Sequence, residues 1–185
     1  MIELFLERLF ATPLSAELVM TLSEAAESCF VLHRVAWQGS LLARDGRRMV
    51  CRFRAPDVES ARLALRQAGA EVTILWPGTV HDAPGLDAGR LAAANVLVER
   101  AFATPVSLDA IQAREDAGAA CLQNHRVRFV RTFFSRDARR MLCLYRAPDA
   151  ESVRLAQHQA GMPLERVWAF QAILPGLPAD STPAA

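Results

Sequence analysis

Lysine is absent from this 185-residue sequence, so that all 21 of its basic side chains are arginines. They are balanced by 20 acidic side chains, which leaves a net charge of +1 and no basic excess that would favour nucleic acid. No apolar run approaches the roughly eighteen residues that a membrane-spanning helix needs. The N-terminal stretch MIELFLERLF carries acids among its apolar residues and predicts a strand, not a signal peptide. We therefore expect a cytoplasmic protein that binds neither nucleic acid nor membrane.

Sequence motifs for the common chemistries are missing as well. The four cysteines are not spaced as CxxC pairs, and the chain is too long for a small disulfide scaffold, so we expect reduced thiols. There is no Gly-rich phosphate loop, no HExxH motif and no Ser-His-Asp set, and the sequence has only four histidines. These absences argue against the best-known enzyme classes.

What the sequence does contain is an internal repeat. The segment ERLFATP that starts at Glu7 returns 92 residues later as ERAFATP from Glu99. In the same way RDGRRMVCRFRAPDVES (44–60) returns as RDARRMLCLYRAPDAES (136–152), and about 31 of 70 aligned positions are identical without a gap. Such self-similarity indicates two copies of one structural unit. We predict repeat 1 at 1–76, a linker at 77–93, repeat 2 at 94–174 and a flexible tail at 175–185.

Each repeat is predicted to have the element order β-α-β-β-α-β. The alternating residues 2–10 indicate a strand, and Ser15 then provides an N-cap for a helix with a regularly spaced apolar stripe. A second strand is expected from about Arg34, and the Asp-Gly pair at 45–46 indicates a hairpin turn before the third strand. Asp57 is the expected N-cap of the second helix, and Gly69 its end.

This order with right-handed crossovers is the ferredoxin-like arrangement, in which helices cover one face of a four-stranded antiparallel sheet. The predicted fold class is therefore α+β, with two tandem ferredoxin-like repeats. Because the helix-free face of each sheet needs a partner, we expect the two sheets to pack face to face as an intrachain pseudo-dimer, similar to a dimeric α/β barrel. The chain is then a monomer, for which the sequence leaves further self-association open.

Two recurring motifs carry a resemblance to a known family. They are the third-strand motif C-x-[FY]-R-A-P-D, followed by a helix ending in Q-A-G, and the opening E-R-x-F-A-T-P. Together they resemble the bacterial family described as domain of unknown function 4242, over nearly all of both repeats. The resemblance implies a ferredoxin-like fold that dimerises through its sheets. It also implies a metal role, with nickel or another transition metal as the cofactor, because some members are described as nickel-binding.

Cysteine and histidine recur at a spacing that suits a metal ion. Cys29 and His33 are four residues apart, so that on a continuous helix they share a face. A third-strand cysteine would complete a Cys2His set in each copy, a donor set that suits zinc, nickel or copper. The alternative is that Cys29 is a small buried residue and that His33 lies beyond the helix end. The predicted metal ligands are Cys29, His33, Cys51, Cys121, His125 and Cys143.

One face of the third strand is a second candidate site. Met49, Cys51 and Phe53 alternate along the strand, and if their face points between the sheets it would line a pocket for a small aromatic or apolar ligand. The alternative is a close-packed core. Glu7 could add a carboxylate of raised pKa, or could pair with an arginine such as Arg54. The cavity candidates are Glu7, Met49, Cys51, Phe53, Glu99, Met141, Cys143 and Tyr145.

Three functions remain open on these observations. The first is a non-enzymatic protein that binds a small molecule or a metal ion, by analogy with the fold and from the duplicated Cys/His set. The second is a small cofactor-independent oxygenase, isomerase or cyclase that uses the cavity between the sheets. The third is a structural or interaction module.

Overall fold

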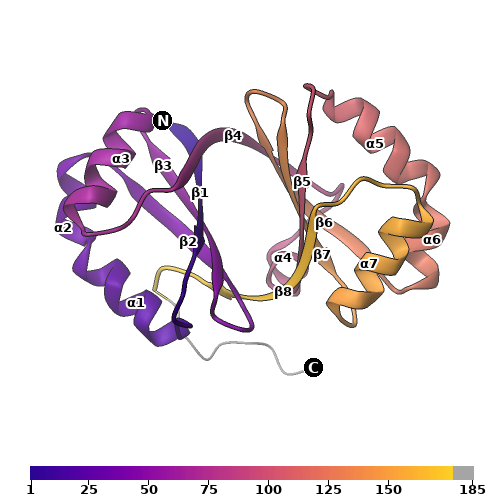
Figure 1. Ribbon diagram of the computed structural model, residues 1–185, viewed down its shortest axis with the longest axis horizontal. Helices are drawn as coiled ribbons and strands as arrows, with labels where there is room; N and C mark the ends of the chain where they lie inside the picture. The colour runs from indigo at the N-terminus through magenta and orange to yellow at the C-terminus, as the bar shows by residue number, and fades with distance from the viewer. Residues whose placement is uncertain (177–185) are drawn as a thin grey trace. The chain divides into compact units, whose positions relative to one another are not determined.

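The computed structural model describes residues 1–176 and divides them into two compact units (Figure 1). Unit 1 comprises residues 1–78 and the described end of the chain from Gln171, and unit 2 comprises residues 79–170. The fold class is α+β, as predicted. The predicted flexible tail lies outside the described residues from position 177 onward. No helix within residues 1–176 is long and apolar enough to cross a membrane.

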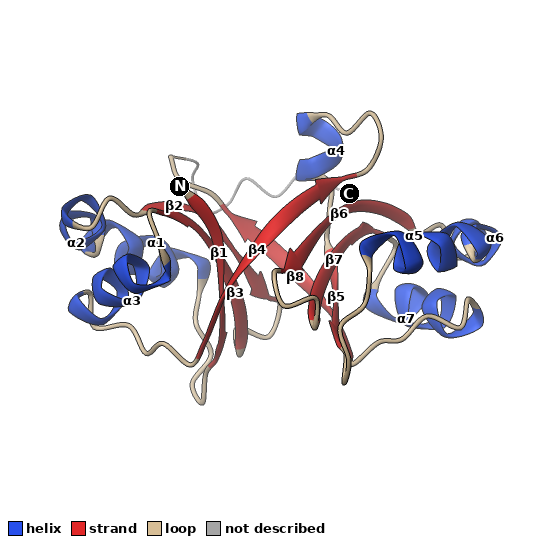
Figure 2. Cartoon of the chain, turned by 90° about the horizontal axis from the view of Figure 1, so that it is seen from above, coloured by secondary structure: helices blue, strands red, loops and turns tan. Residues whose placement is uncertain are grey.

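Unit 1 is an antiparallel sheet with helices on one face (Figure 2). Strand β1 pairs with both β3 and β4, and β2 pairs with β3, which gives the order β2-β3-β1-β4. The end of β4, from Thr79, groups with unit 2. The elements are β1 (Ile2–Leu9), α1 (Ala16–Ala25), α2 (Glu27–Leu32), β2 (Ala36–Ala43), β3 (Arg48–Ala55), α3 (Val58–Gln67) and β4 (Ile74–Asp82).

Unit 2 has the same element order after one additional short helix, and its helices α5, α6 and α7 cover one face of its sheet (Figure 2). Strand β5 pairs with β7 and β8, and β6 pairs with β7, so the order is β6-β7-β5-β8. The end of β8, from Gln171, groups with unit 1. The elements are α4 (Ala88–Ala92), β5 (Val96–Ala101), α5 (Leu108–Ala117), α6 (Ala119–Asn124), β6 (Arg128–Ser135), β7 (Arg140–Arg146), α7 (Ala150–Gln159) and β8 (Arg166–Ile173).

The helix ends follow the local sequence closely. The Ser15 hydroxyl accepts a hydrogen bond from the backbone N–H of Leu18 at 3.1 Å, and the Asp57 carboxylate accepts one from Ser60 at 2.7 Å. Both side chains satisfy amide protons that the first helical turn leaves unpaired, as predicted for N-caps. Gly69 follows α3 with φ +75°, the left-handed conformation that glycine adopts most easily.

The first predicted helix is broken into two pieces. Helix α1 ends at Ala25 and α2 begins at Glu27, with Ala26 buried at the junction. The predicted apolar stripe therefore does not continue along one face, and the side chain of Leu22 is 49% exposed. Helix α2 ends with a left-handed Arg34, and the N–H of Val35 donates to the carbonyl of Phe30 at 2.8 Å. Because this cap occupies Arg34, strand β2 begins only at Ala36.

Strand β2 contains a bulge that changes which side chains reach the helix-covered face. The pairing register with β3 shifts between Trp37 and Gly39, and Gly39 has φ +122°. In a regular strand, residues 37 and 40 would point to opposite faces. The bulge brings Trp37 and Ser40 to the same side, where the indole Nε1 donates to the Ser40 hydroxyl at 3.1 Å.

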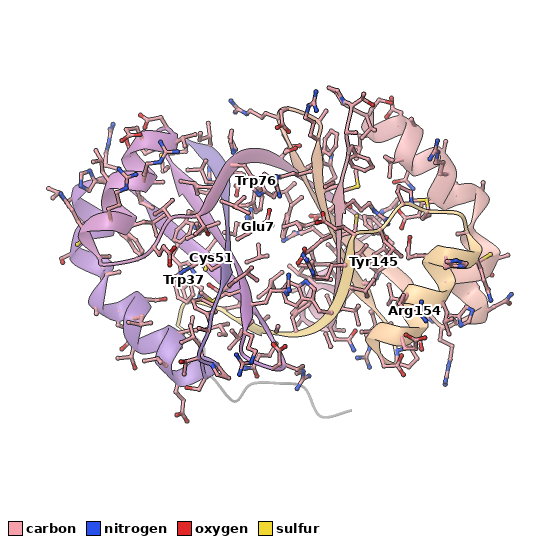
Figure 3. The ribbon with its side chains drawn as sticks, viewed as in Figure 1. Glu7, Trp37, Cys51, Trp76, Tyr145 and Arg154 are labelled. Atoms are coloured by element: carbon pink, nitrogen blue, oxygen red, sulfur yellow. The ribbon has the colours of Figure 1, made fainter. Side chains whose placement is uncertain are left out.

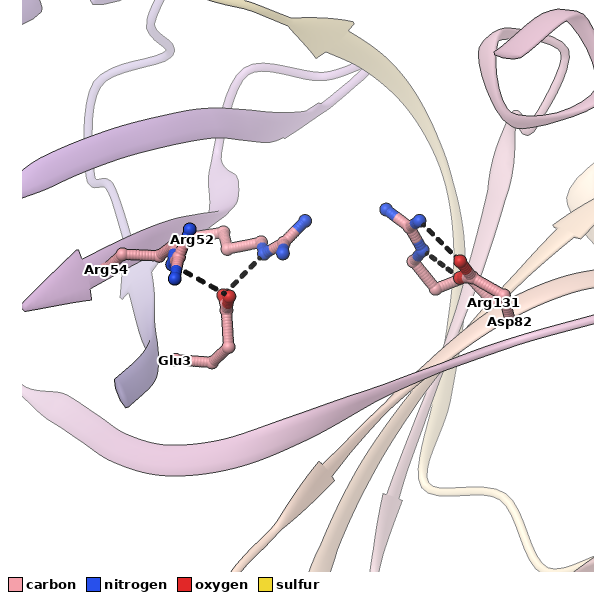
Figure 4. Close-up of polar contacts among 5 residues, drawn as sticks. All are labelled: Glu3, Arg52, Arg54, Asp82 and Arg131. Atoms are coloured by element: carbon pink, nitrogen blue, oxygen red, sulfur yellow. Dashed lines mark hydrogen bonds and ion pairs between the residues drawn. The ribbon is translucent and has the colours of Figure 1, made fainter. Parts of the chain in front are cut away.

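The segment 77–93, predicted as a linker, is instead largely ordered secondary structure. Strand β4 continues through it, with Pro77 opposite Leu4 and Gly78 opposite Glu3. The Pro-Gly pair is a turn signal on its own, but strand pairing overrides it here. The strand end at Asp82 receives two hydrogen bonds from Arg131, at 2.5 and 3.0 Å (Figure 4), and α4 follows from Ala88.

Candidate ligand-binding site

The third strand of unit 1 turns its predicted site residues toward the helices, not away from them. Met49, Cys51 and Phe53 belong to the core cluster that also contains helix residues such as Val19 and Leu65. In the β1–β3 ladder Leu6 lies opposite Cys51, which places the apolar side chains of β1 on this same face. The condition on which the predicted pocket depended, that these three side chains point between two sheets, is therefore not met in unit 1, because the helices cover the more apolar face of the sheet.

The equivalent strand of unit 2 behaves in the same way. Met141, Cys143 and Tyr145 pack in a core cluster with helix residues such as Ile111 and Val153. All three strand side chains are buried, and Tyr145 is fully inaccessible. They line the interior of unit 2 under its helices.

The two glutamates lie apart from these strand residues. Glu7 belongs to the other face of β1, where Trp76 Nε1 donates to its carboxylate at 2.6 Å (Figure 3). Glu99 is held likewise by Trp168 Nε1 at 2.6 Å and by Arg166 at 2.7 Å. The predicted set of eight cavity residues is thus split between the two faces of each sheet.

Arg54, which was proposed as a partner of Glu7, forms an ion pair with a different acid. Arg54 pairs with Glu3 at 3.5 Å, and Arg52 donates to the same carboxylate at 2.7 Å (Figure 4). The register explains this, because Glu3 lies directly opposite Arg54 in the β1–β3 ladder. Arg54 thus does pair with an acid of the first strand, but this acid is Glu3 and not Glu7.

A cavity of about 100 Å³ lies between the sheet and the helices of unit 1. Strands β1, β2 and β3, helices α1, α2 and α3, and the turn after α3 all contribute residues to its lining. Most of this lining is apolar. The lining residues are Leu6, Arg8, Val19, Leu22, Ser23, Ala26, Phe30, Trp37, Ser40, Met49, Cys51, Phe53, Leu65, Ala68, Gly69 and Ala70.

The floor of the cavity carries a short chain of polar groups. Trp37 Nε1 donates to Ser40 Oγ, and the Ser40 hydroxyl donates to Cys51 Sγ at 3.0 Å. Burial raises the pKa of the Cys51 thiol to about 11, although the hydrogen bond from Ser40 and the charge of Arg8 act in the opposite direction. The thiol is therefore protonated at neutral pH. Arg8 is the one charged residue among those that line the cavity.

Unit 2 carries larger or more polar side chains at several of the equivalent positions. Ser23, Phe53, Leu65 and Ala70 of the cavity wall correspond through the 92-residue offset to other residues in the second copy. Their counterparts, in the same order, are Glu115, Tyr145, Gln157 and Met162, and all four are buried. The region that is hollow in unit 1 is occupied by side chains in unit 2.

These side chains form a buried polar network around Arg100, the counterpart of Arg8. Arg100 Nη2 donates to Tyr145 Oη at 3.1 Å and to Gln157 Oε1 at 3.0 Å, and Nη1 donates to the carbonyl of Pro163. The Tyr145 hydroxyl in turn donates to the Glu115 carboxylate. Arg100 is only 2% exposed, and this network provides hydrogen-bond acceptors for its two terminal nitrogens. Its Nε and the Gln157 Nε2 are buried without a hydrogen-bond partner among the described residues.

Burial shifts the pKa values of the acid groups in this network. It raises the pKa of Glu115, while the hydrogen bond from Tyr145 and the charge of Arg100 act to lower it. It also raises the pKa of Tyr145 well above its ordinary value. Burial acts to lower the pKa of Arg100, but the neighbouring Tyr145, Cys143 and Glu115 more than offset this effect and raise it. The guanidinium is therefore charged at every physiological pH.

The predicted metal ligands are not brought together in either unit. His33 Nε2 lies 2.9 Å from Gln67 Oε1, and His125 Nε2 lies 3.0 Å from Gln159 Oε1, so each histidine links the ends of two helices. Cys51 is buried under the helices with Ser40 as its partner, and Cys143 is placed similarly beside Thr132. Across residues 1–176, no three His, Cys, Asp or Glu side chains are grouped so that they could hold a metal ion. Cys29 and His33 do lie one helical turn apart, since the N–H of His33 donates to the Cys29 carbonyl at 3.3 Å, but the strand cysteine of each predicted set is held beside Ser40 or Thr132.

Most of unit 2 is similar to a described family. Residues 97–169 match the family model "Nickel responsive protein SCO4226-like". Among solved structures, SCO4226 from Streptomyces coelicolor A3(2) is 19% identical over 40% of this chain and 91% of its own, with a TM-score of 0.37. A mutant chlorite dismutase from Candidatus Nitrospira defluvii is 13% identical over 96% of this chain and 91% of its own, with a TM-score of 0.49. No curated protein matches the sequence.

The residues that distinguish the two units were not found from the sequence. Arg8 and Arg100 belong to the repeated E-R-x-F-A-T-P motif but were given no role, Ser23 and Ser40 belong to no motif, and only the single tyrosine at 145 stood out. A usable signal was present, however, because the repeats differ at 23/115, 53/145 and 65/157, each time with a more polar side chain in the second copy. When one copy is more polar than the other at several positions, those positions are candidates for side chains that contact one another.

Proposed function

We propose that this protein binds a small, largely apolar ligand in the unit 1 cavity. The observation that supports the proposal is an apolar space of about 100 Å³ with a few polar groups, at a place where the second copy is filled by Tyr145 and Gln157. Ligand sites in proteins have this composition. An apolar cavity of about 150 Å³ holds a benzene-sized molecule, so the part of a ligand that lies within this space of about 100 Å³ is no larger than that.

The chemistry of the cavity favours binding over catalysis. A general acid or base works best when its pKa lies near the operating pH. Among the described lining residues, Cys51 has a pKa of about 11, so its thiol does not exchange protons near neutral pH. The alternative of a cofactor-independent oxygenase, isomerase or cyclase acting between the sheets stays a prediction.

We also propose that the two units are tandem copies of one ferredoxin-like domain, in which the first copy keeps a binding cavity and the second has a filled core. The equal element order and the 92-residue offset of the sequence support this. The sheet-to-sheet pseudo-dimer, the monomeric state and further self-association stay predictions.

Nickel is the cofactor that the matched family's name and the sequence resemblance bring forward. The residues present here do not fit such a site. The thiols of Cys51 and Cys143 are buried and hold their protons, and His33 and His125 each have a glutamine as partner. A metal ligand has to be deprotonated and has to converge with others on one point. We therefore assign no metal to the proposed function.

The proposal is tested by titrating the full chain with benzamide and with benzoate by calorimetry, while the fluorescence of Trp37 in the cavity wall is followed. We expect saturable one-to-one binding of at least one of the two probes. The variant Ala70→Met introduces the residue that unit 2 carries at position 162 and should weaken binding by about tenfold or more, because it occupies the cavity.

The matched control is Ala92→Met, at an exposed position at the end of α4, which should bind as the wild type does. If neither probe binds, or if the two methionine variants bind equally well, the cavity is not a ligand site and the proposal is wrong.

A further inference from the structure

The two equivalent arginines of the repeat have opposite surroundings. Arg100 is buried and has three hydrogen-bond acceptors, with the Glu115 carboxylate nearby. Arg8 lines the unit 1 cavity, and its guanidinium carbon lies 4.9 Å from the centre of the Phe10 ring. Within residues 1–176 no acidic side chain forms an ion pair with Arg8.

The change in surroundings comes from the same substitutions that open the cavity. Where unit 2 has the Glu115 carboxylate, unit 1 has the shorter hydroxyl of Ser23. Where unit 2 has the hydroxyl of Tyr145, unit 1 has the bare ring of Phe53. Unit 1 therefore lacks the acid side chain, which leaves space, and lacks its negative charge as well, while the arginine remains.

We propose that the ligand of the unit 1 cavity is a small monocarboxylate with an apolar body. Its carboxylate takes the place that the Tyr145 hydroxyl and the Glu115 carboxylate occupy together in unit 2, so that it reaches Arg8 directly. Its body fills the apolar space over Ser40 and Cys51. This inference rests on the proposed function and specifies its ligand. A planar guanidinium can bind a carboxylate through two parallel hydrogen bonds, which makes arginine well suited to this role.

The other charges around the cavity determine the orientation and the charge of the ligand. A neighbouring groove shares Ser23, Phe30 and Trp37 with the cavity and is also lined by three acids, Glu17, Glu24 and Glu27. A carboxylate is repelled on that side, so it points toward Arg8 and the apolar body points toward the groove. A dianion such as phosphate would leave one charge without a partner in an apolar space, which is unfavourable.

Benzoate and benzamide test the inference because they have nearly the same shape and differ in charge. For the wild-type chain at neutral pH and low salt we expect benzoate to bind at least about tenfold more tightly than benzamide. In Arg8→Gln this preference should disappear while the affinity for benzamide is kept. In Ser23→Glu, which introduces the acid of unit 2 into the cavity, both probes should bind more weakly, and benzoate should lose most.

Each outcome decides between the inference and the function on which it rests. Equal affinities of the two probes for the wild type, or a preference for benzoate that survives in Arg8→Gln, would overturn the inference and leave a neutral-ligand cavity standing. Binding of neither probe would overturn both. Arg8→Lys is the second variant, which keeps the charge without the planar fork and should keep a reduced preference for benzoate.

Discussion

Single residues in this chain take their properties from where the fold places them, and the cysteines show this most simply. Cys29 and Cys121 are partly exposed, whereas Cys51 and Cys143 are buried under the helices, and all four are free thiols. Burial raises the pKa of Cys51 to about 11 and also raises that of Cys143. The thiolate is the reactive form of cysteine, so the exposed pair should be more reactive than the buried pair, while the two members of each pair, which the 92-residue offset makes equivalent, should react alike.

The first prediction concerns this difference. At pH 8 a pKa raised from 9.0 to about 11 lowers the thiolate fraction of Cys51 by about a hundredfold. With a chromogenic disulfide reagent we therefore expect two fast thiols and two slow ones in the native chain, and four fast ones in denaturant. Cys29→Ser should remove one fast thiol, and Cys51→Ser should remove none. Four equally fast thiols in the native chain would contradict the placement of β3 and β7 side chains under the helices.

The second prediction concerns Glu115, whose pKa burial raises above its ordinary 4.5 in spite of Tyr145 and Arg100. The folded chain keeps this proton to higher pH than the unfolded chain does, so the contribution of Glu115 to stability is complete below pH 4.5 and is lost as the pH rises through the raised pKa. Glu115→Gln lacks this titration. The unfolding free energy of the wild type minus that of the variant should therefore fall as the pH increases from 4.5, in urea unfolding curves at successive pH values. A difference that stays constant or increases would show that Glu115 is not buried as described.

At the scale of elements, the two units differ at the junction between their first two helices. Gly118 lies at this junction in unit 2, and a Cβ atom added there would lie only 2.5 Å from the Cβ of Ala160. Unit 1 has Ala26 and Ala68 at the equivalent positions, and both line the cavity. A methyl group at Ala26 rules out the close approach that glycine allows at this junction in unit 2.

The third prediction follows from this contact. Gly118→Ala forces the α5–α6 junction away from Ala160 and should lower the free energy of unfolding by about 1–3 kcal/mol, as overpacking does elsewhere. The control is Gly89→Ala in α4, where an added Cβ meets nothing closer than 3.4 Å and no loss is expected. Chemical denaturation of both variants provides the comparison. If Gly118→Ala is as stable as its control, the helix junction of unit 2 does not depend on the close contact between Gly118 and Ala160.

Sequence reasoning succeeded for elements where the signal is local. The caps at Ser15 and Asp57 and the helix end at Gly69 were predicted correctly, because each depends on a few neighbouring residues. It failed where long-range pairing decides. The pattern Met49, Cys51, Phe53 indicates that one face of a strand is apolar but does not indicate which layer covers it. The Pro77–Gly78 pair in β4 shows the same limit, since pairing with β1 overrides its turn signal.

At the scale of the whole chain, the two units have the same element order and different interiors. The repeat is evident in the sequence, but the cavity is not, because it results from what several small differences do together in space. Ser23, Leu65 and Ala70 each replace a larger or more polar residue of the second copy, and no one of them is unusual by itself. Only their common position around Arg8 and Cys51 makes them a candidate site.

The claim at the centre of this account is that unit 1 holds an apolar cavity where unit 2 is filled, and a crystal structure of the full chain under xenon pressure tests it most directly. Xenon enters apolar cavities of this kind without needing any particular ligand chemistry. The account predicts a xenon atom in unit 1 among Phe30, Cys51 and Leu65, and none in the equivalent region of unit 2 around Arg100. Unit 1 without xenon and with its side chains closed over the space, or equal xenon occupancy in the two units, would contradict it.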